Sequence, residues 1–225
     1  MNEMRWFLIP AREETKVVAS ELGIQPEIAR ILTNRNICTP EEARIFLFGR
    51  MDDLHHPELM KGMKEAVQRI RQAVSQQERI LIFGDYDVDG VLSVVVLTKA
   101  LRSLGANVDY FIPERLKDGY GIKEEHISIA IERGARLVIS VDCGTKATQF
   151  ADRAKESGVD LIITDHHLPG DRLPDALAIL NPIINESGYP DKGLAGIGVV
   201  FKLIQALFAG KAGSDFLPHY LKLVA

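Results

Sequence analysis

Three aspartates occupy alternate positions directly after an apolar run of the chain. Residues 80–90 read Ile-Leu-Ile-Phe-Gly-Asp-Tyr-Asp-Val-Asp-Gly, which places Asp85, Asp87 and Asp89 within a few residues of one another. Like charges this close raise one another's pKa unless a positive charge lies between them. A divalent cation is the usual partner, because hard cations take carboxylate oxygens as ligands. The segment therefore predicts a metal site.

Two other structures could account for this segment. Aspartate is common in turns, because it tolerates turn geometry and hydrogen-bonds its own backbone. Asp-x-Asp-x-Asp-Gly also opens the EF-hand calcium loop, which needs Glu at its twelfth position. Counting from Asp85 puts Val96 there, and the preceding residues read as a strand where an EF-hand needs a helix. The EF-hand is therefore disfavoured.

Acidic and imidazole side chains also follow two later strand-like segments. Asp142 follows an apolar run, and Asp165, His166 and His167 follow another. Ligands of an open parallel sheet bind beyond the carboxyl ends of its strands, so three segments are expected to meet at one edge. Each could be a helix cap, a turn or a surface residue if it stood alone. Three such coincidences at matching strand ends favour a single site.

The expected ligand set combines several carboxylates with one or two imidazoles and needs no cysteine. This mixture suits Mn²⁺, Mg²⁺ or Fe²⁺ better than it suits a closed structural zinc site. Four or more carboxylates can hold two cations about 3.5–4 Å apart. Such a pair activates a water and neutralises charge on a phosphoryl group. The expected chemistry is therefore hydrolysis of phosphoesters or phosphodiesters.

The elements that must position these residues alternate between strand and helix from residue 79 onward. Continuous apolar strands separated by helices of about 10–15 residues predict a parallel sheet. The expected fold class is α/β, a doubly wound, mainly parallel sheet preceded by a small helical N-terminal arm. The arm is expected over residues 1–55 and the catalytic domain over 56–225. Strands are predicted over residues 79–83, 107–112, 137–141, 161–164 and 177–180. Helices are predicted over residues 13–22, 26–32, 40–47, 58–76, 91–104, 123–133, 146–157, 195–210 and 214–225.

Composition excludes some classes of protein. The net charge of −4 gives no global basic field, so any binding of nucleic acid must come from a local groove. The longest apolar runs are too short to span a bilayer. Cys38 and Cys143 lie far apart and indicate no disulfide framework, so a reducing, cytoplasmic setting is expected.

Four ordered blocks resemble the DHH phosphoesterases, and among them the RecJ-type exonucleases specific for single-stranded DNA. The blocks are residues 84–90, 141–144, 165–167 and 194–203, and residues 113–122 resemble that family's linker after the second strand. The resemblance implies hydrolysis of single-stranded DNA in the 5′→3′ direction, in repair and recombination. It implies two divalent cations, Mn²⁺ or Mg²⁺, as cofactors. The implied partners are single-stranded DNA and single-strand-binding or other repair proteins, without a membrane.

The resemblance also implies roles for single residues. Asp87 and Asp142 would hold one metal, and Asp89, Asp142 and His166 the other, so Asp142 would bridge the two. Asp85 would be a ligand or its close neighbour. His167 would act on the scissile phosphate as a catalytic residue together with Asp142.

Three further positions are implied with more distant roles. Asp165 is expected to orient a histidine, as carboxylates behind metal ligands do. Arg115 and Tyr120 are expected to contact a phosphate and a base of the substrate, although a surface arginine and a packed loop tyrosine would look the same.

Two alternatives stay open from the sequence. The first is a DHH phosphoesterase acting on short oligonucleotides or pyrophosphate, although those relatives typically carry His where this chain has Phe83. The second is a non-catalytic DHH-fold scaffold, which would have lost acids that this chain keeps. The family also continues past a segment like residues 221–225 into a strand with one more metal-binding Asp. These 225 residues are therefore expected to be a truncated catalytic domain, weakly active or inactive alone.

Overall fold

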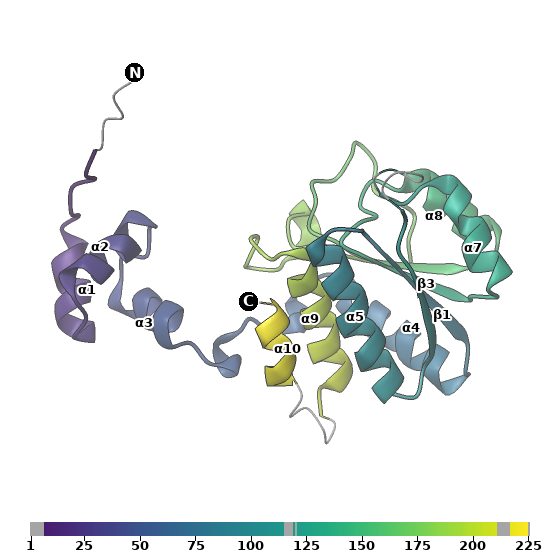
Figure 1. Cartoon of the computed structure of the whole chain (residues 1–225), viewed down its shortest axis with the longest axis horizontal. Helices are drawn as coiled ribbons and strands as arrows, with labels where there is room; N and C mark the ends of the chain where they lie inside the picture. The colour runs from purple at the N-terminus through teal and green to yellow at the C-terminus, as the bar shows by residue number, and fades with distance from the viewer. Residues whose placement is uncertain (1–6, 115–118, 120, 211–216, 225) are drawn as a thin grey trace. The chain divides into compact units, whose positions relative to one another are not determined.

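The computed structural model describes residues 7–114, 119, 121–210 and 217–224. The chain divides into two compact units, Met1–Leu54 and His55–Ala225 (Figure 1). Each unit is described by itself.

The first unit contains three short helices, as the sequence predicts. Prolines at their first positions start the second and third helices, because the missing N–H of proline costs nothing there. Thr39 caps the third helix: its hydroxyl accepts a hydrogen bond from Glu42 N, and the Glu42 carboxylate accepts one from Thr39 N. The helices are α1 (Glu14–Leu22), α2 (Pro26–Asn34) and α3 (Pro40–Phe48). They pack around a small buried cluster of Val18, Ala29, Leu32 and Ala43.

The second unit is built on a five-stranded parallel sheet with the order β2-β1-β3-β4-β5. The strands are β1 (Arg79–Gly84), β2 (Asn107–Phe111), β3 (Leu137–Val141), β4 (Asp160–Thr164) and β5 (Ala178–Leu180). Every predicted strand is present, with its ends within one residue of the prediction. The sheet is parallel throughout, so the predicted α/β fold class is confirmed.

Helices cover both faces of this sheet (Figure 1). One face carries α4 (Met63–Ser75), α5 (Val88–Ser103) and α9 (Gly196–Phe208), and α10 (Leu217–Val224) packs on α9. The other face carries α7 (Ile127–Glu132) and α8 (Thr148–Glu156), which bury a core around Phe83, Val138 and Phe150. Gln205 is the only residue of α9 that is not buried, as expected of a helix that is apolar nearly all round. Short 3₁₀ turns lie at Met51–Asp53, Pro57–Leu59, Glu124–His126 and Asn185–Ser187.

Among the helices whose starts lie in continuously described segments, three begin three or more residues away from the prediction. Helix α7 begins at Ile127, four residues later than predicted, because residues 124–126 form a 3₁₀ turn. Helix α4 begins at Met63, five residues later than predicted, because residues 57–59 form a 3₁₀ turn and Gly62 has a φ of 86°. Helix α5 begins at Val88, three residues earlier than predicted, because the Asp87 carboxylate caps it by accepting a hydrogen bond from Gly90 N. Asp87 and Asp89 therefore belong to the start of a helix and not to a loop.

The register of the sheet brings the candidate residues together. The last paired residues of four neighbouring strands are in line with one another: Gly84, Val141, Thr164 and Leu180. Because the strands are parallel, the next residue of each strand emerges at the same edge. These four residues are Asp85, Asp142, Asp165 and Asn181.

Candidate metal centre

Asp142 is almost completely buried, with 1% of its surface exposed. Its Oδ1 lies 3.1 Å from His166 Nε2 but accepts no hydrogen bond from any residue that the structure describes. Burial, together with the negative charges of Asp89, Asp87 and Asp165, raises the pKa of Asp142 to about 8. A buried carboxylate oxygen without a donor, among like charges, fits a cation, which would favour the ionised form.

The backbone of Asp142 is also unusual. Its φ of 59° is in the left-handed region, which non-glycine residues seldom adopt. Asp142 N donates a hydrogen bond to Thr164 O at 2.9 Å, which extends the pairing of β3 with β4 by one residue. Behind the carboxylate lies Gly196, where a Cβ atom would come within 2.8 Å of Asp142 Cγ. The Asp142 side chain therefore needs a glycine at the start of α9.

Asp85 and Asp87 form one group with Asp142, in which one ligand oxygen from each residue lies within 4.8 Å of the others. Asp85 is buried and accepts a hydrogen bond from Tyr86 N at 2.7 Å. Burial, with a smaller contribution from the charge of Asp87, raises the pKa of Asp85. Three carboxylates at this spacing are a ligand set for a hard divalent cation.

Asp89 binds the beginning of α9 with both of its oxygens. Its Oδ2 accepts a hydrogen bond from Gly196 N at 2.7 Å, and its Oδ1 accepts one from Ile197 N at 2.6 Å. The same Oδ2 lies 3.7 Å from His166 Nε2. Because each carboxylate oxygen has a second lone pair, these bonds leave Asp89 able to contact a cation. Asp89 therefore adjoins the metal group and also joins α5 to α9, a contact that the sequence did not reveal.

The two histidines form a second group with Asp142, again with one ligand atom of each within 4.8 Å of the others. Asp165 lies behind them and accepts hydrogen bonds from His167 Nδ1 at 2.7 Å and from Thr145 N at 2.8 Å. Burial alone would raise the pKa of Asp165, but the hydrogen bonds from Thr145 and His167 outweigh it and lower the pKa. An ionised Asp165 fixes the His167 ring with Nε2 directed away from it.

Asn181 is a residue of the site that the sequence pattern did not indicate. Its Nδ2 donates to Thr145 Oγ1 at 3.0 Å and to His167 O at 2.9 Å, so it holds the loop that carries the histidines. The rule that found the other residues applies to it as well, because Asn181 directly follows β5. Because β5 is short and no acidic residue follows it, the sequence around Asn181 did not indicate a functional site.

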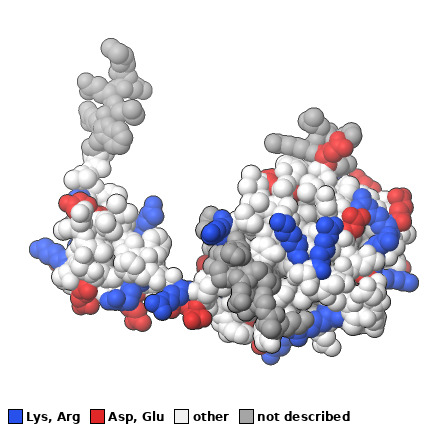
Figure 2. Space-filling model, turned by 60° about the horizontal axis from the view of Figure 1, so that its bottom comes forward, with Lys and Arg blue, Asp and Glu red and all other residues white. Residues whose placement is uncertain are grey.

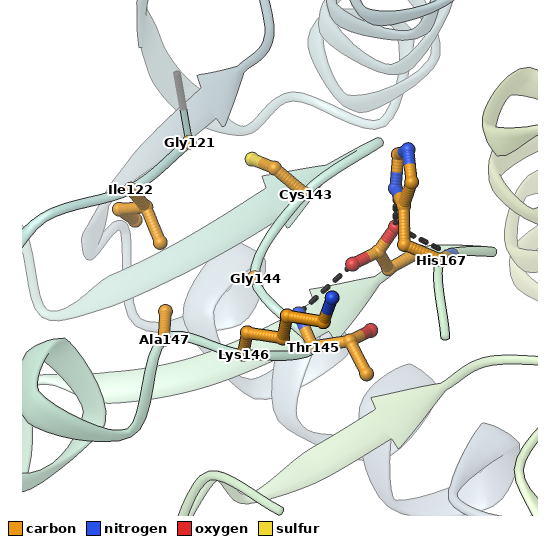
Figure 3. A pocket seen from close by; sticks show the side chains of 9 residues that line it. Gly121, Ile122, Cys143, Gly144, Thr145, Lys146, Ala147 and His167 are labelled. Carbon is orange, nitrogen blue, oxygen red and sulfur yellow. Dashed lines mark hydrogen bonds and ion pairs between the residues drawn. The ribbon is translucent and has the colours of Figure 1, made fainter. Parts of the chain in front are cut away.

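A pocket of about 210 Å³ adjoins this cluster and shares the Asp165–His167 pair as one wall (Figure 3). The opposite side is formed by Ile122, Cys143 and Ala147, and Lys146 lies at its edge. On the face shown in Figure 2, basic side chains are separated by uncharged and acidic residues and form no continuous basic surface over the described residues.

The structure brings together the seven predicted residues Asp85, Asp87, Asp89, Asp142, Asp165, His166 and His167. Arg115 and Tyr120, the predicted substrate contacts, lie outside the described residues. The described residues form no helix long and apolar enough to cross a membrane.

Comparison with known proteins identifies one protein family. The model of the DHH family, N-terminal domain, matches residues 79–225. The single-stranded-DNA-specific exonuclease RecJ of Bacillus subtilis (strain 168) is 48% identical over 207 residues, which are 92% of this chain and 26% of that protein. The RecJ exonuclease of Escherichia coli (strain K12) is 37% identical over 196 residues, covering 87% of this chain and 33% of that protein. The chain thus spans a third or less of the length of these relatives.

Solved structures give the same match. A crystal structure of RecJ in complex with Mn²⁺ from Thermus thermophilus superposes with a TM-score of 0.74 at 29% identity, covering 96% of this chain and 30% of that one. A crystal structure of exonuclease RecJ bound to manganese superposes with a TM-score of 0.65 at 36% identity, covering 73% of this chain and 42% of that one.

Proposed function

Because the chain belongs to the DHH family, we propose that its second unit is the metal-binding catalytic domain of an exonuclease specific for single-stranded DNA. The observation that carries the proposal is Asp142, which belongs to both ligand groups and has a buried carboxylate oxygen with no hydrogen-bond donor among the described residues. A carboxylate shared by two such groups is what a pair of divalent cations requires. The relatives named as single-stranded-DNA-specific exonucleases, and the two manganese-bound structures, support the substrate and the metal.

The residues of the two ligand groups have separate roles in this proposal. Asp85 and Asp87 would hold one Mn²⁺ or Mg²⁺ ion with Asp142, and His166 would hold the second with Asp142 and Asp89. Such ions would supply a water of lowered pKa and would offset the negative charge of the phosphoryl group. The chain's own contribution is to fix these ligands on the ends of three strands.

His167 completes the proposed chemistry. Its ring is held by Asp165 through Nδ1 at 2.7 Å, which directs Nε2 to the side away from Asp165, where it orients the scissile phosphate or donates a proton to the leaving oxygen. Asp165 is a positioning residue in this scheme, because it acts through the His167 ring.

Metal binding tests the proposal without relying on activity. Asp142→Asn removes the charge while keeping the size of the side chain, and we expect it to abolish the rise in melting temperature and the calorimetric heat that Mn²⁺ produces with the wild-type chain. Asp171→Asn, an exposed aspartate outside the cluster, is the matched control. Unchanged Mn²⁺ binding by Asp142→Asn would refute the shared-ligand role, and a wild-type chain that binds no Mn²⁺ would favour a scaffold.

Hydrolysis tests the finer statements. We expect Mn²⁺-dependent release of nucleotides from single-stranded DNA, at a low rate when these 225 residues act alone, little release from duplex DNA, and a loss of at least about 100-fold in Asp142→Asn. Digestion in the 5′→3′ direction predicts that a 5′-labelled strand loses its label at once, whereas a 3′-labelled strand gives a ladder. The reverse pattern would contradict the direction. A cytoplasmic setting and a single-strand-binding or repair protein as partner belong to the same proposal.

A further inference from the structure

The pocket beside the metal cluster is placed to receive part of the substrate. The Asp165–His167 pair lines it, and His167 also belongs to the metal group with Asp142 and His166. A phosphodiester at the cluster therefore has this pocket directly beyond His167. Its volume of about 210 Å³ is below the ~300 Å³ of sites for drug-sized ligands, so it fits a fragment the size of one nucleotide unit.

The lining of the pocket is divided by chemistry (Figure 3). Ile122, Cys143 and Ala147 give it an apolar side, suited to a sugar or a base. Cys143 is buried, so it contributes apolar surface to this side of the pocket. The polar side holds Thr145, Asp165, His167 and the exposed Lys146.

Lys146 is the one lysine or arginine among the described residues that line this pocket. It forms no ion pair with any described residue, and in Figure 3 its side chain extends toward the side of the pocket on which His167 lies. Its ammonium group is therefore available to a ligand. Lys155 on the neighbouring helix α8 differs, because it is paired with Asp175 at 2.5 Å.

The charges of the cluster create a need for such a cation. Two divalent ions do not fully neutralise the five carboxylates of Asp85, Asp87, Asp89, Asp142 and Asp165. A second phosphate of the substrate, next to the one at the metals, would meet a net negative potential there. A lysine at the edge of the pocket offsets that repulsion, because its ammonium binds phosphate as a point charge.

We propose that this pocket is a nucleotide subsite. Its apolar side receives the sugar and base next to the scissile phosphate, and Lys146 binds the second phosphate attached to that sugar. The subsite rests on the proposed function, since it needs a phosphodiester at the cluster. It makes the enzyme select a chain of nucleotides over an isolated phosphodiester.

Binding of single-stranded DNA tests the subsite separately from hydrolysis. The probe is a 3′-labelled oligothymidylate with phosphorothioate linkages, bound to the full chain with Mn²⁺ and followed by fluorescence anisotropy. We expect Lys146→Ala to raise Kd on the order of tenfold at low salt and to reduce the slope of log K against log[salt] by about 0.7, the value for one phosphate contact on a single strand. Lys146→Arg should restore both.

Two further variants separate the subsite from a general charge effect. Lys99→Ala removes an exposed lysine from α5, outside the pocket, and should leave Kd and slope near the wild-type values. Ala147→Leu should weaken binding without changing the salt slope, because it fills the apolar side; circular dichroism checks that it folds.

The outcomes separate the subsite from the function. Wild-type affinity in Lys146→Ala, or an equal loss in Lys99→Ala, overturns the subsite. Loss of probe binding in Lys146→Ala, with no calorimetric heat of Mn²⁺ binding by the wild-type chain, would leave the subsite standing and remove the proposed metal-dependent function. A wild-type chain that does not bind the probe overturns the subsite.

Discussion

At the scale of single residues, the site is organised by how each carboxylate is partnered. Asp85, Asp87, Asp89 and Asp165 accept hydrogen bonds from backbone N–H groups. Asp142 differs, because its Oδ1 has no donor among the described residues. Hydrogen bonds to backbone N–H groups hold carboxylates in place. The first four are therefore fixed in direction by the fold itself, and the last depends on a cation.

Asp165→Asn tests the positioning role of Asp165. We expect a 10- to 100-fold lower rate of DNA hydrolysis, because the His167 ring loses its charged acceptor. Mn²⁺ affinity, measured by calorimetry, should fall far less than in Asp142→Asn. Asp175→Asn, which removes only a surface ion pair with Lys155, is the control. A loss of Mn²⁺ binding equal to that of Asp142→Asn would make Asp165 a direct ligand.

At the scale of elements, the metal centre is as much a helix junction as a sheet edge. Asp89 at the start of α5 binds the first two N–H groups of α9, and Gly196 lets the same end of α9 lie against Asp142. A negative charge at a helix N-terminus is favourable because it faces the positive end of the helix dipole. The position of α9 and the geometry of the ligands are therefore linked.

Gly196→Ala and Gly198→Ala form a matched pair on α9. The first places a methyl group within 2.8 Å of Asp142 Cβ, and we expect it to cost about 1–3 kcal/mol in the free energy of unfolding and to weaken Mn²⁺ binding. The second meets only the flexible Leu194 side chain at 3.3 Å, so the gain of about 0.5–1 kcal/mol for Ala over Gly in a helix should offset the contact. Urea unfolding in EDTA measures the stability of both variants, and calorimetry measures their Mn²⁺ binding. Equal stability of the two variants would contradict the close fit at Gly196.

The strands and their polar ends were predictable for a simple reason. Each strand is a short apolar run with β-branched residues, and a parallel sheet necessarily gathers the residues after its strands at one edge. The bonds from Asp89 to α9 were not predictable, because they join residues more than 100 positions apart. The left-handed backbone of Asp142 was not predictable either, because no local pattern at this non-glycine residue indicates it. The early start of α5 has a local cause, the Asp87 cap, which the apolar pattern used for the prediction overlooked.

At the scale of the whole second unit, one buried lysine ties its first residue to its central helix. Lys202 on α9 is 3% exposed, and its Nζ donates to His55 O at 2.8 Å and to Gln205 Oε1 at 3.1 Å. Burial lowers the pKa of Lys202 from 10.5 to about 8, partly opposed by the charge of Asp191. Charging the Lys202 ammonium group is therefore unfavourable in the folded state. The hydrogen bond from Nζ to His55 O partly offsets this cost.

This lysine predicts a dependence of stability on pH. The pKa is lower in the folded state, so between about pH 8 and 10.5 the unfolded chain binds more protons, and stability rises with pH across that window. The difference in free energy of unfolding between Lys202→Met and the wild type should therefore change by roughly 3 kcal/mol in favour of the wild type as pH rises from below 8 to above 10.5. Urea titrations at several pH values measure it, with Lys99→Met as the exposed control. A pH-independent difference would show that Lys202 titrates normally.

The left-handed backbone of Asp142 limits which amino acids evolution can accept at that position. Glycine adopts this conformation most easily but brings no ligand. Asparagine tolerates it but brings no charge, and glutamate brings the charge but neither the short reach nor the backbone tolerance. Aspartate is thus the one amino acid that combines a short charged side chain with tolerance of this backbone. We therefore expect position 142 to accept fewer substitutions than the neighbouring aspartates, whose backbones are not left-handed.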